Sequence, residues 1–194
     1  MKIACTLTQK LVEKKIVDAK EYDIYCYGIN QLMWYLINFL TVIIIGVFTK
    51  NLFFLFSFFV CYIPLRSFAG GIHARTPLAC YICSVVALAV VGVAGKYEVS
   101  GYVALIVILL CNVVICAIAP VEDENKPLDK TEEIIYKKKT KTIIIAYSIV
   151  TLVSKLLNQH FLLKVMLYVS ACILVMLLLG NMKNVFRRKV ETRD

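Results

Sequence analysis

Long and almost uncharged apolar blocks limit what this chain can fold into more than any other feature. They cover residues 30–49, 52–65, 78–95, 101–119, 142–157 and 161–182. Their apolar residues do not recur with the period of 3.6 that marks an amphipathic surface helix, so the blocks are apolar on every side. Overall, 60% of the residues are apolar and 18% are charged, against about 45–50% and about 25% in an average soluble domain. The sequence predicts an all-α fold, a polytopic membrane helical bundle with about six transmembrane segments.

We expect residues 1–194 to form a single integral membrane domain with three parts. Residues 1–29 form an arm, 30–182 the membrane helices and 183–194 a basic tail. In the arm, the spacing of Ile3, Leu7 and Leu11 suggests an amphipathic helix on the membrane surface, although an ordinary solvated helix fits this pattern equally well.

The block 52–65 would span about 21 Å as a helix, which is short of the ~30 Å hydrocarbon core. It must therefore continue through residues 66–69 or stop inside the protein. Residues 120–141 are predicted to form the main hydrophilic loop.

The basic residues are distributed unevenly about the apolar blocks. Of the 22 lysines and arginines, 18 fall in the arm, the 66–77 and 120–141 loops and the tail. By the positive-inside rule this places both termini and both loops in the cytoplasm, beneath the plasma membrane. The net charge of +9 is thus interpreted as topology-setting, and no nucleic-acid partner is expected, because such a partner needs a basic stripe on a soluble fold.

Eight cysteines do not indicate a disulfide framework here. Five of them lie inside apolar blocks, where a thiol behaves as a small hydrophobe: Cys61, Cys83, Cys111, Cys116 and Cys172. We interpret the cysteines as reduced. The pair Cys80 and Cys83 forms a lone CxxC without a second pair, so no zinc site is predicted, and no metal or cofactor is expected.

His73 and Cys80 are the pair that could carry out chemistry. Thr76-Pro77 is typical of a helix start, which puts Cys80 in the first turn, where the helix dipole favours a thiolate. Gly70-Gly71 lets the chain turn sharply and bring the His73 imidazole back towards the sulfur. In a continuous helix, residues seven apart would also share a face. A Cys–His pair is sufficient for nucleophilic acyl transfer, but cysteines in membrane helices usually only pack, so the spacing alone leaves both interpretations open.

Two groups of cations are candidate supporting residues. Arg66 and Arg75 are costly in lipid unless they face a polar cavity; they could bind a substrate carboxylate or stabilise an oxyanion, or they could only set the topology. Lys137, Lys138 and Lys139 could hold an acidic peptide, or they could anchor the chain to anionic lipid.

At these residues the sequence resembles a known family. The run 66–80, RSFAGGIHARTPLAC, is similar to the signature of the AgrB family, the membrane peptidases of peptide quorum sensing, and the matching positions are Arg66, Gly71, His73 and Cys80. The chain length, the multiple spans and the loop residues Pro120-Val121 and Asn125–Leu128 also fit this family. The resemblance extends over nearly the whole chain.

The resemblance implies a cysteine endopeptidase that acts on an AgrD-like precursor peptide. In such proteins the enzyme removes the acidic C-terminal tail of the precursor and cyclises the remainder to a thiolactone or lactone. His73 would take the thiol proton, and Cys80 would attack the scissile carbonyl to form a thioester. The lipid bilayer and a second copy of the chain are further candidate partners. The alternative is a small membrane permease or exporter without covalent chemistry.

Overall fold

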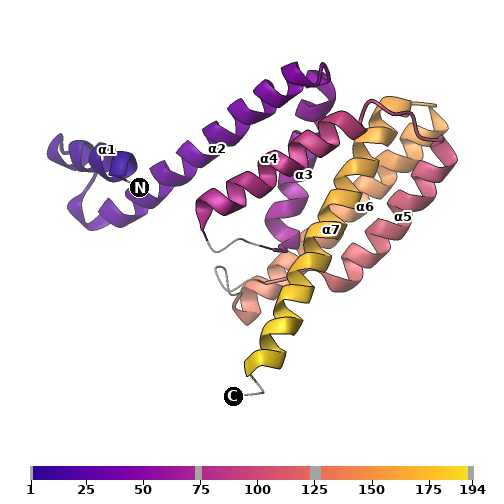
Figure 1. Ribbon diagram of the computed structural model, residues 1–194. Helices are drawn as coiled ribbons and strands as arrows, with labels where there is room; N and C mark the ends of the chain where they lie inside the picture. The colour runs from indigo at the N-terminus through magenta and orange to yellow at the C-terminus, as the bar shows by residue number, and fades with distance from the viewer. Residues whose placement is uncertain (1, 73–75, 123–127, 192–194) are drawn as a thin grey trace. The chain divides into compact units, whose positions relative to one another are not determined.

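The computed structural model describes residues 2–72, 76–122 and 128–191 of the chain (Figure 1). Their secondary structure is helical, which confirms the expected all-α class. The elements are α1 (Lys2–Glu13), a short 3-10 helix η1 (Ala19–Glu21), α2 (Tyr22–Phe48), α3 (Leu52–Ala69), α4 (Pro77–Ala94), α5 (Gly101–Ile118), α6 (Lys130–Leu156) and α7 (His160–Glu191).

Five helical segments among the described residues are long and apolar enough to cross a membrane. They are Ala19–Phe48, Leu52–Ala69, Pro77–Ala94, Gly101–Ile118 and His160–Arg187. The remaining predicted block, 142–157, lies in α6, whose first turns carry the charged run from Lys130 to Lys141. The fold is therefore a helical membrane bundle, and the chain is a multi-pass membrane protein.

The second apolar block does not stop short inside the protein. Helix α3 continues through Pro64 and Arg66 to Ala69 and has 18 residues, or about 27 Å of helix. The first of the two alternatives for this block is therefore correct.

The prediction of a loop over residues 120–141 is wrong in its C-terminal half, because α6 already begins at Lys130. Asp129 and Glu132 form a capping box there: the backbone N–H of Glu132 donates to Asp129 Oδ1 at 2.6 Å, and the backbone N–H of Asp129 donates to Glu132 Oε2 at 3.3 Å. Such a box satisfies amides that a helix start leaves unpaired. Similarly, α7 continues through the predicted tail as far as Glu191.

The chain forms two compact units, Met1–Ile44 and Ile45–Asp194, and its treatment as a single domain stays a prediction. In the first unit, the expected helix of the arm is present as α1. A disulfide joins Cys5 of α1 to Cys26 of α2, and the Cα atoms of these residues lie 5.1 Å apart. The Tyr22 hydroxyl donates to the carbonyl oxygen of Cys5 at 3.4 Å.

The interpretation of all eight cysteines as reduced is therefore wrong for Cys5 and Cys26. The chain reverses between α1 and α2, and this reversal brings the two residues to a Cα separation that suits a disulfide. The other six cysteines are free.

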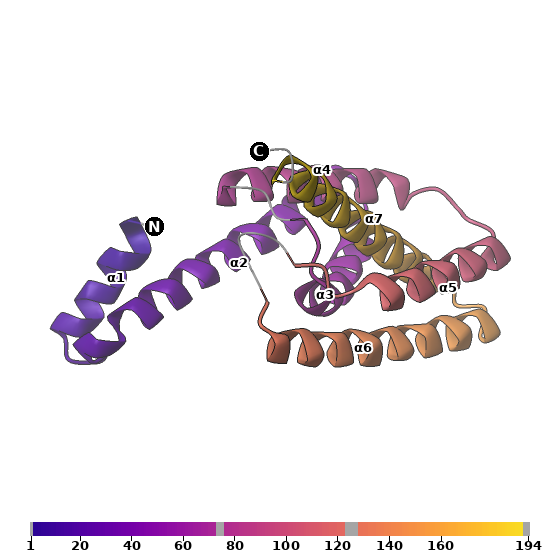
Figure 2. The same ribbon diagram turned by 90° about the horizontal axis from the view of Figure 1, so that it is seen from below.

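In the second unit, α7 packs against α3, α5 and α6, and α5 lies beside α6 in both views (Figures 1 and 2). Apolar side chains from three helices fill the centre and are fully buried, among them Leu55, Leu65, Ile108, Ile115, Ile173 and Leu177. Large apolar side chains such as Phe53, Val113 and Ile145 are exposed on the outside, as expected for helices that face lipid.

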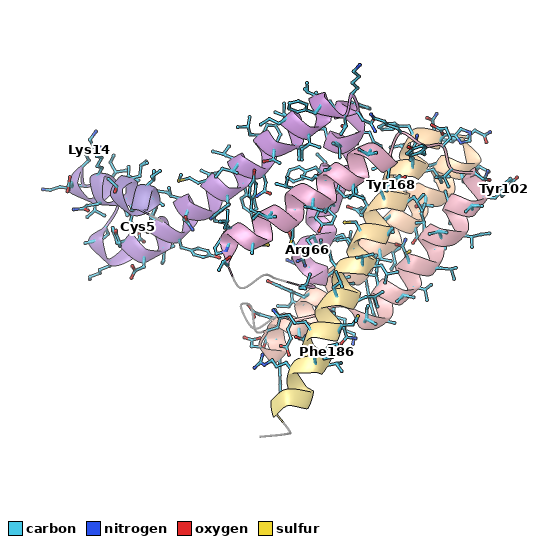
Figure 3. The ribbon with its side chains drawn as sticks, viewed as in Figure 1. Cys5, Lys14, Arg66, Tyr102, Tyr168 and Phe186 are labelled. Atoms are coloured by element: carbon cyan, nitrogen blue, oxygen red, sulfur yellow. A yellow bond between two sulfur atoms is a disulfide. The ribbon has the colours of Figure 1, made fainter. Side chains whose placement is uncertain are left out.

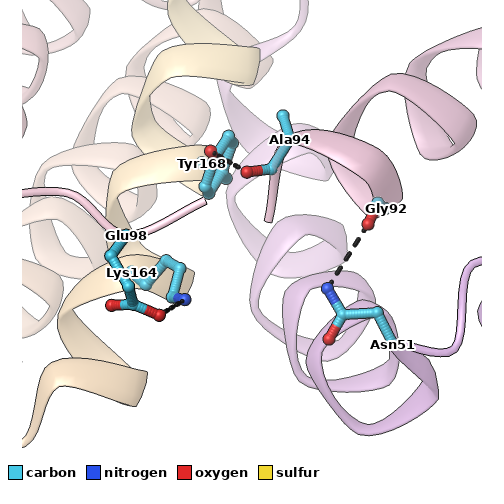
Figure 4. Close-up of polar contacts among 6 residues, drawn as sticks. All are labelled: Asn51, Gly92, Ala94, Glu98, Lys164 and Tyr168. Atoms are coloured by element: carbon cyan, nitrogen blue, oxygen red, sulfur yellow. Dashed lines mark hydrogen bonds and ion pairs between the residues drawn. The ribbon is translucent and has the colours of Figure 1, made fainter. Parts of the chain in front are cut away.

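One end of this unit is closed by polar contacts between helix termini (Figure 4). The Tyr168 hydroxyl donates to the carbonyl oxygen of Ala94 at 2.6 Å, and Asn51 Nδ2 donates to that of Gly92 at 3.3 Å. Lys164 Nζ lies 2.7 Å from Glu98 Oε1. This hydrogen bond and the positive charge of Lys164 hold the pKa of the Glu98 carboxyl below its ordinary value. These contacts fix α4 against α3 and α7 at the end of the unit that lies away from Arg66 and Cys80.

A buried polar cluster joins three helices inside the second unit. Asn112 of α5 donates from Nδ2 to Ser148 Oγ of α6 at 3.0 Å, and Ser170 Oγ of α7 donates to Asn112 Oδ1 at 2.9 Å. Asn112 and Ser170 are almost completely buried. Hydrogen bonds of this kind bind membrane helices together because lipid offers the polar groups no alternative partner.

Candidate active site

The chain leaves α3 through Gly70 and Gly71, which both have positive φ angles, 74° and 114°. A Cβ atom at Gly70 would collide with the carbonyl oxygen of Val121, and one at Gly71 would lie 2.9 Å from the carbonyl oxygen of Met176. Both positions therefore require glycine.

Main-chain hydrogen bonds dock this loop between two other segments. Val121 N–H donates to Ala69 O at 3.0 Å, and Gly71 N–H donates back to Val121 O at 2.9 Å. Ile72 N–H then donates to Met176 O of α7 at 3.1 Å. The chain is thus held in place up to the residue that immediately precedes His73.

Arg66 holds the same loop from the side of α3 (Figure 3). Its Nη2 donates to the carbonyl oxygen of Ile72 at 2.7 Å, and its Nη1 donates to that of Gly70. Arg66 is half-buried, and two main-chain oxygens of the loop accept hydrogen bonds from its guanidinium. The predicted polar surroundings of Arg66 are therefore the main chain of the loop, while a contact with substrate stays a prediction.

Tyr62 extends this cluster towards α4 and α7. Arg66 and Cys172 are electrostatic neighbours of the Tyr62 hydroxyl. Cys80 lies within electrostatic range of the same hydroxyl. Neither Tyr62 nor Cys172 was predicted from the sequence as a site residue. The available signal was the spacing of Tyr62 and Arg66, which stand four residues apart on one face of a helix.

Cys80 lies in the first turn of α4, as predicted. Thr76 caps this helix, because its Oγ1 accepts a hydrogen bond from Ala79 N–H at 3.2 Å, and Pro77 is the first helical residue. The backbone N–H of Cys80 donates to Thr76 O at 3.1 Å. The thiol of Cys80 is half-buried and free, whereas Cys83 is exposed one turn later.

His73 and Arg75 lie outside the described residues. The structure fixes the chain on either side of them, at Ile72 and at Thr76. The pairing of His73 with Cys80 therefore stays a prediction, and so does the role of Arg75.

The three lysines lie on α6 close to the end of α3. Lys139 Nζ is 4.6 Å from the centroid of the Phe68 ring, and the Tyr136 ring meets Phe68 edge-on at 5.6 Å. Lys137 and Lys138 are exposed. This arrangement brings the basic run of α6 to the same end of the unit as Arg66.

A cavity of about 240 Å³ lies beside the loop. Its lining residues are Ile118, Pro120, Val121, Glu122, Leu128, Glu133, Asn181, Asn184 and Val185. Asn184 Nδ2 donates to the carbonyl oxygen of Glu122 at 2.9 Å. Carboxylate and amide groups line this cavity, and the three lysines do not. Within the described ranges, no group of three or more His, Cys, Asp or Glu side chains is placed to hold a metal ion.

Comparison with known proteins gives consistent results. The family model of accessory gene regulator B (AgrB) matches residues 4–182. An AgrB-like protein from Clostridium perfringens (strain SM101 / Type A) is 26% identical over 141 residues, which cover 64% of this chain and 64% of the relative. AgrB-like protein 2 from Clostridium perfringens (strain 13 / Type A) is 27% identical over 141 residues, with the same coverage of both chains.

The match thus spans somewhat less than two thirds of the length of these relatives. No solved structure matches the chain. The family model, in contrast, extends from the arm to the last apolar block and includes the loop, α4 and the lysines of α6. On this match, the chain belongs to the accessory gene regulator B family.

Proposed function

We propose that this protein is a membrane cysteine endopeptidase that processes a quorum-sensing pro-peptide. It would cleave off the C-terminal part of an AgrD-like precursor and cyclise the product to a thiolactone or lactone. The observation that carries the proposal is the position of Cys80 in the first turn of a helix that Thr76 caps. Arg66 holds the loop that leads into His73 through its hydrogen bond to Ile72.

Cleavage would begin with proton transfer from the Cys80 thiol to His73. The thiolate attacks the scissile carbonyl carbon, and the resulting tetrahedral intermediate collapses with cleavage of the peptide C–N bond. His73 returns its proton to the departing amine of the C-terminal fragment. The remainder of the precursor stays bound to Cys80 as a thioester. An unassisted thiol ionises near pH ~8.5, so a base is needed for this chemistry at neutral pH.

Cyclisation would follow by exchange of the acyl group. An internal thiol or hydroxyl of the precursor attacks the thioester carbonyl, His73 takes its proton, and the Cys80 thiolate leaves and is reprotonated. A thiol gives a thiolactone and a hydroxyl gives a lactone. The tethered nucleophile has to react before water does, which a recessed site at the membrane boundary favours through proximity and exclusion of water.

The other predicted residues would support these steps. Arg66, Gly70 and Gly71 fix the loop, and the lysines at 137–139 attract the acidic tail of the precursor electrostatically. Arg75 would assist in binding the same acidic segment or the developing oxyanion. The protein would lie in the plasma membrane with both termini and this site on the cytoplasmic side, as the positive-inside rule predicts.

Reconstitution with a precursor peptide tests the proposal. Purified protein in liposomes receives a synthetic AgrD-like precursor, and mass spectrometry follows the cleaved tail and the cyclic product. Cys80→Ala should abolish both products. The control is Cys83→Ala, which removes an exposed thiol one turn away and should retain most of the activity. A Cys80→Ala protein that processes the precursor fully would leave the permease or exporter as the better account.

A further inference from the structure

Gly180 of α7 lies directly beneath the loop that leads into His73. The residue is buried, and a Cβ atom placed on it would lie 2.8 Å from Ile72 N and 2.9 Å from the carbonyl carbon of Gly71. Both neighbours are backbone atoms, which cannot rotate aside as the end of a side chain can. The main chain of the loop therefore packs directly against the backbone of α7 at Gly180.

This contact coincides with the hydrogen bond that anchors the loop. Ile72 N–H donates to Met176 O at 3.1 Å, and Met176 stands one helical turn before Gly180, so its carbonyl points along the helix towards that residue. The carbonyl group of Ile72 is held by Arg66 from α3. The peptide groups on both sides of Ile72 are thus fixed by two different helices, and the next residue is His73.

We propose that Gly180 is a positioning residue that sets the placement of His73 relative to Cys80. The proposal rests on the proposed function, since it concerns the base of that reaction. A methyl group at position 180 would require Ile72 N to move by about 0.6 Å to reach the 3.4 Å of an ordinary contact. This movement would lengthen the hydrogen bond to Met176 and shift the chain that enters His73. Displacements of about 1 Å at a catalytic group can cost about 100-fold in rate.

Two other helix glycines provide matched controls. Gly92 of α4 is also buried, but its Cβ would meet side-chain atoms, Leu55 Cδ1 at 3.0 Å and Thr49 Cγ2 at 3.1 Å. Gly92→Ala therefore disturbs helix packing without touching the loop. A methyl group at Gly28 of α2 would have no atom within 4 Å, so Gly28→Ala tests only the exchange of glycine for alanine in a helix.

The experiment compares Gly180→Ala with these controls in the full-length protein in liposomes. Three measurements are made: steady-state kinetics of the precursor, which give kcat and KM, the pH dependence of Cys80 alkylation by iodoacetamide, and hydrogen exchange at the Ile72 amide. For Gly180→Ala we expect kcat to fall by about 10- to 100-fold while KM changes little. Cys80 alkylation should require higher pH, because the base is misplaced, and the Ile72 amide should exchange faster. Both controls should give wild-type values in all three measurements.

A Gly180→Ala protein with wild-type kcat and a wild-type alkylation profile would overturn the proposal. If this variant fails to accumulate, hydrogen exchange at the Ile72 amide of the unmodified protein tests the proposal instead. Rapid exchange there would contradict it, because it would show that the loop is not docked on α7. This exchange measurement does not depend on the enzymatic reaction. Processing by Cys80→Ala, in contrast, would contradict the peptidase function and leave the docking of the loop intact.

Discussion

The guanidinium of Arg66 donates a hydrogen bond from Nη2 to the carbonyl oxygen of Ile72, 2.7 Å away. Its second terminal nitrogen donates to the carbonyl oxygen of Gly70. One side chain at the end of α3 thus forms hydrogen bonds with two residues of the loop, Gly70 and Ile72. The second of these residues immediately precedes His73. A planar guanidinium can reach two acceptors in this way, whereas the ammonium group of lysine is a single point charge on a flexible stem.

Arg66→Lys should therefore impair the reaction although the charge is kept. We expect kcat for precursor processing to fall by about 10- to 100-fold, with normal insertion into the membrane because the positive charge that sets the topology is unchanged. The measurement is single-turnover cleavage in liposomes. The matched control is Arg187→Lys, which changes an exposed arginine on α7 and should be without effect. Wild-type kcat in Arg66→Lys would contradict the role of the two hydrogen bonds.

The buried cluster around Asn112 should contribute to stability rather than to catalysis. Asn112→Ala removes the hydrogen bonds to Ser148 and Ser170 and leaves both hydroxyls without this partner. We expect the free energy of unfolding to fall by about 1–2 kcal/mol, since each hydrogen bond between membrane helices contributes about 0.6 kcal/mol and up to ~1.7. Unfolding in detergent micelles measures this change. Asn38→Ala is the control, because Asn38 Nδ2 donates to the carbonyl oxygen of Trp34 within its own helix, and an equal loss there would refute the assignment.

The lysines of α6 should act on binding of the precursor. Exchange of Lys137, Lys138 and Lys139 together for glutamine should raise KM several-fold and leave kcat nearly unchanged, because in the proposed function these side chains attract the acidic tail and do not take part in bond cleavage. The salt dependence of KM should weaken as well, since salt screens exposed charges. Lys50→Gln with Lys96→Gln, two exposed changes elsewhere, is the control. Unaltered KM in the triple variant would mean that the lysines only anchor α6 to lipid.

The orientation in the membrane can be measured by cysteine labelling of intact cells. Thr131 at the start of α6 and Tyr97 between α4 and α5 are both exposed, and they lie on opposite sides in the predicted topology. An impermeant maleimide should label Tyr97→Cys, while Thr131→Cys should react only after the cells are opened. Labelling of Thr131→Cys from outside would reverse the topology and place the proposed site on the wrong side of the membrane for a cytoplasmic precursor.

The membrane helices and the start of α4 could be predicted from the sequence because their signals are local. Apolar runs determine the spans, and Thr76-Pro77 determines where α4 begins and hence that Cys80 lies in its first turn. The early start of α6 was missed, although the capping pair Asp129 and Glu132 is a local signal, because the charges around it suggested a loop.

Other features depend on contacts between distant residues, which no local pattern reveals. The disulfide between Cys5 and Cys26 requires the chain reversal between α1 and α2. The closeness of Gly180 to Ile72 requires knowledge of which face of α7 the loop crosses. Gly70 and Gly71 were correctly identified as a turn, but the loop that they begin docks on Val121 and Met176, which lie about 50 and about 100 residues further along the chain.

The central claim, covalent catalysis by Cys80 with His73 as its base, is tested most directly by trapping the thioester. The protein is mixed with a precursor whose internal nucleophile has been replaced by alanine, so that cyclisation cannot release the acyl group. After rapid acid quenching, peptide mass spectrometry should find the N-terminal part of the precursor attached to Cys80, and neutral hydroxylamine should remove it. His73→Ala should give no adduct. The control is His160→Ala, which changes the first residue of α7, away from the loop contact at Met176, and should give the normal amount. An adduct on another cysteine, or cleavage by Cys80→Ala, would contradict the claim.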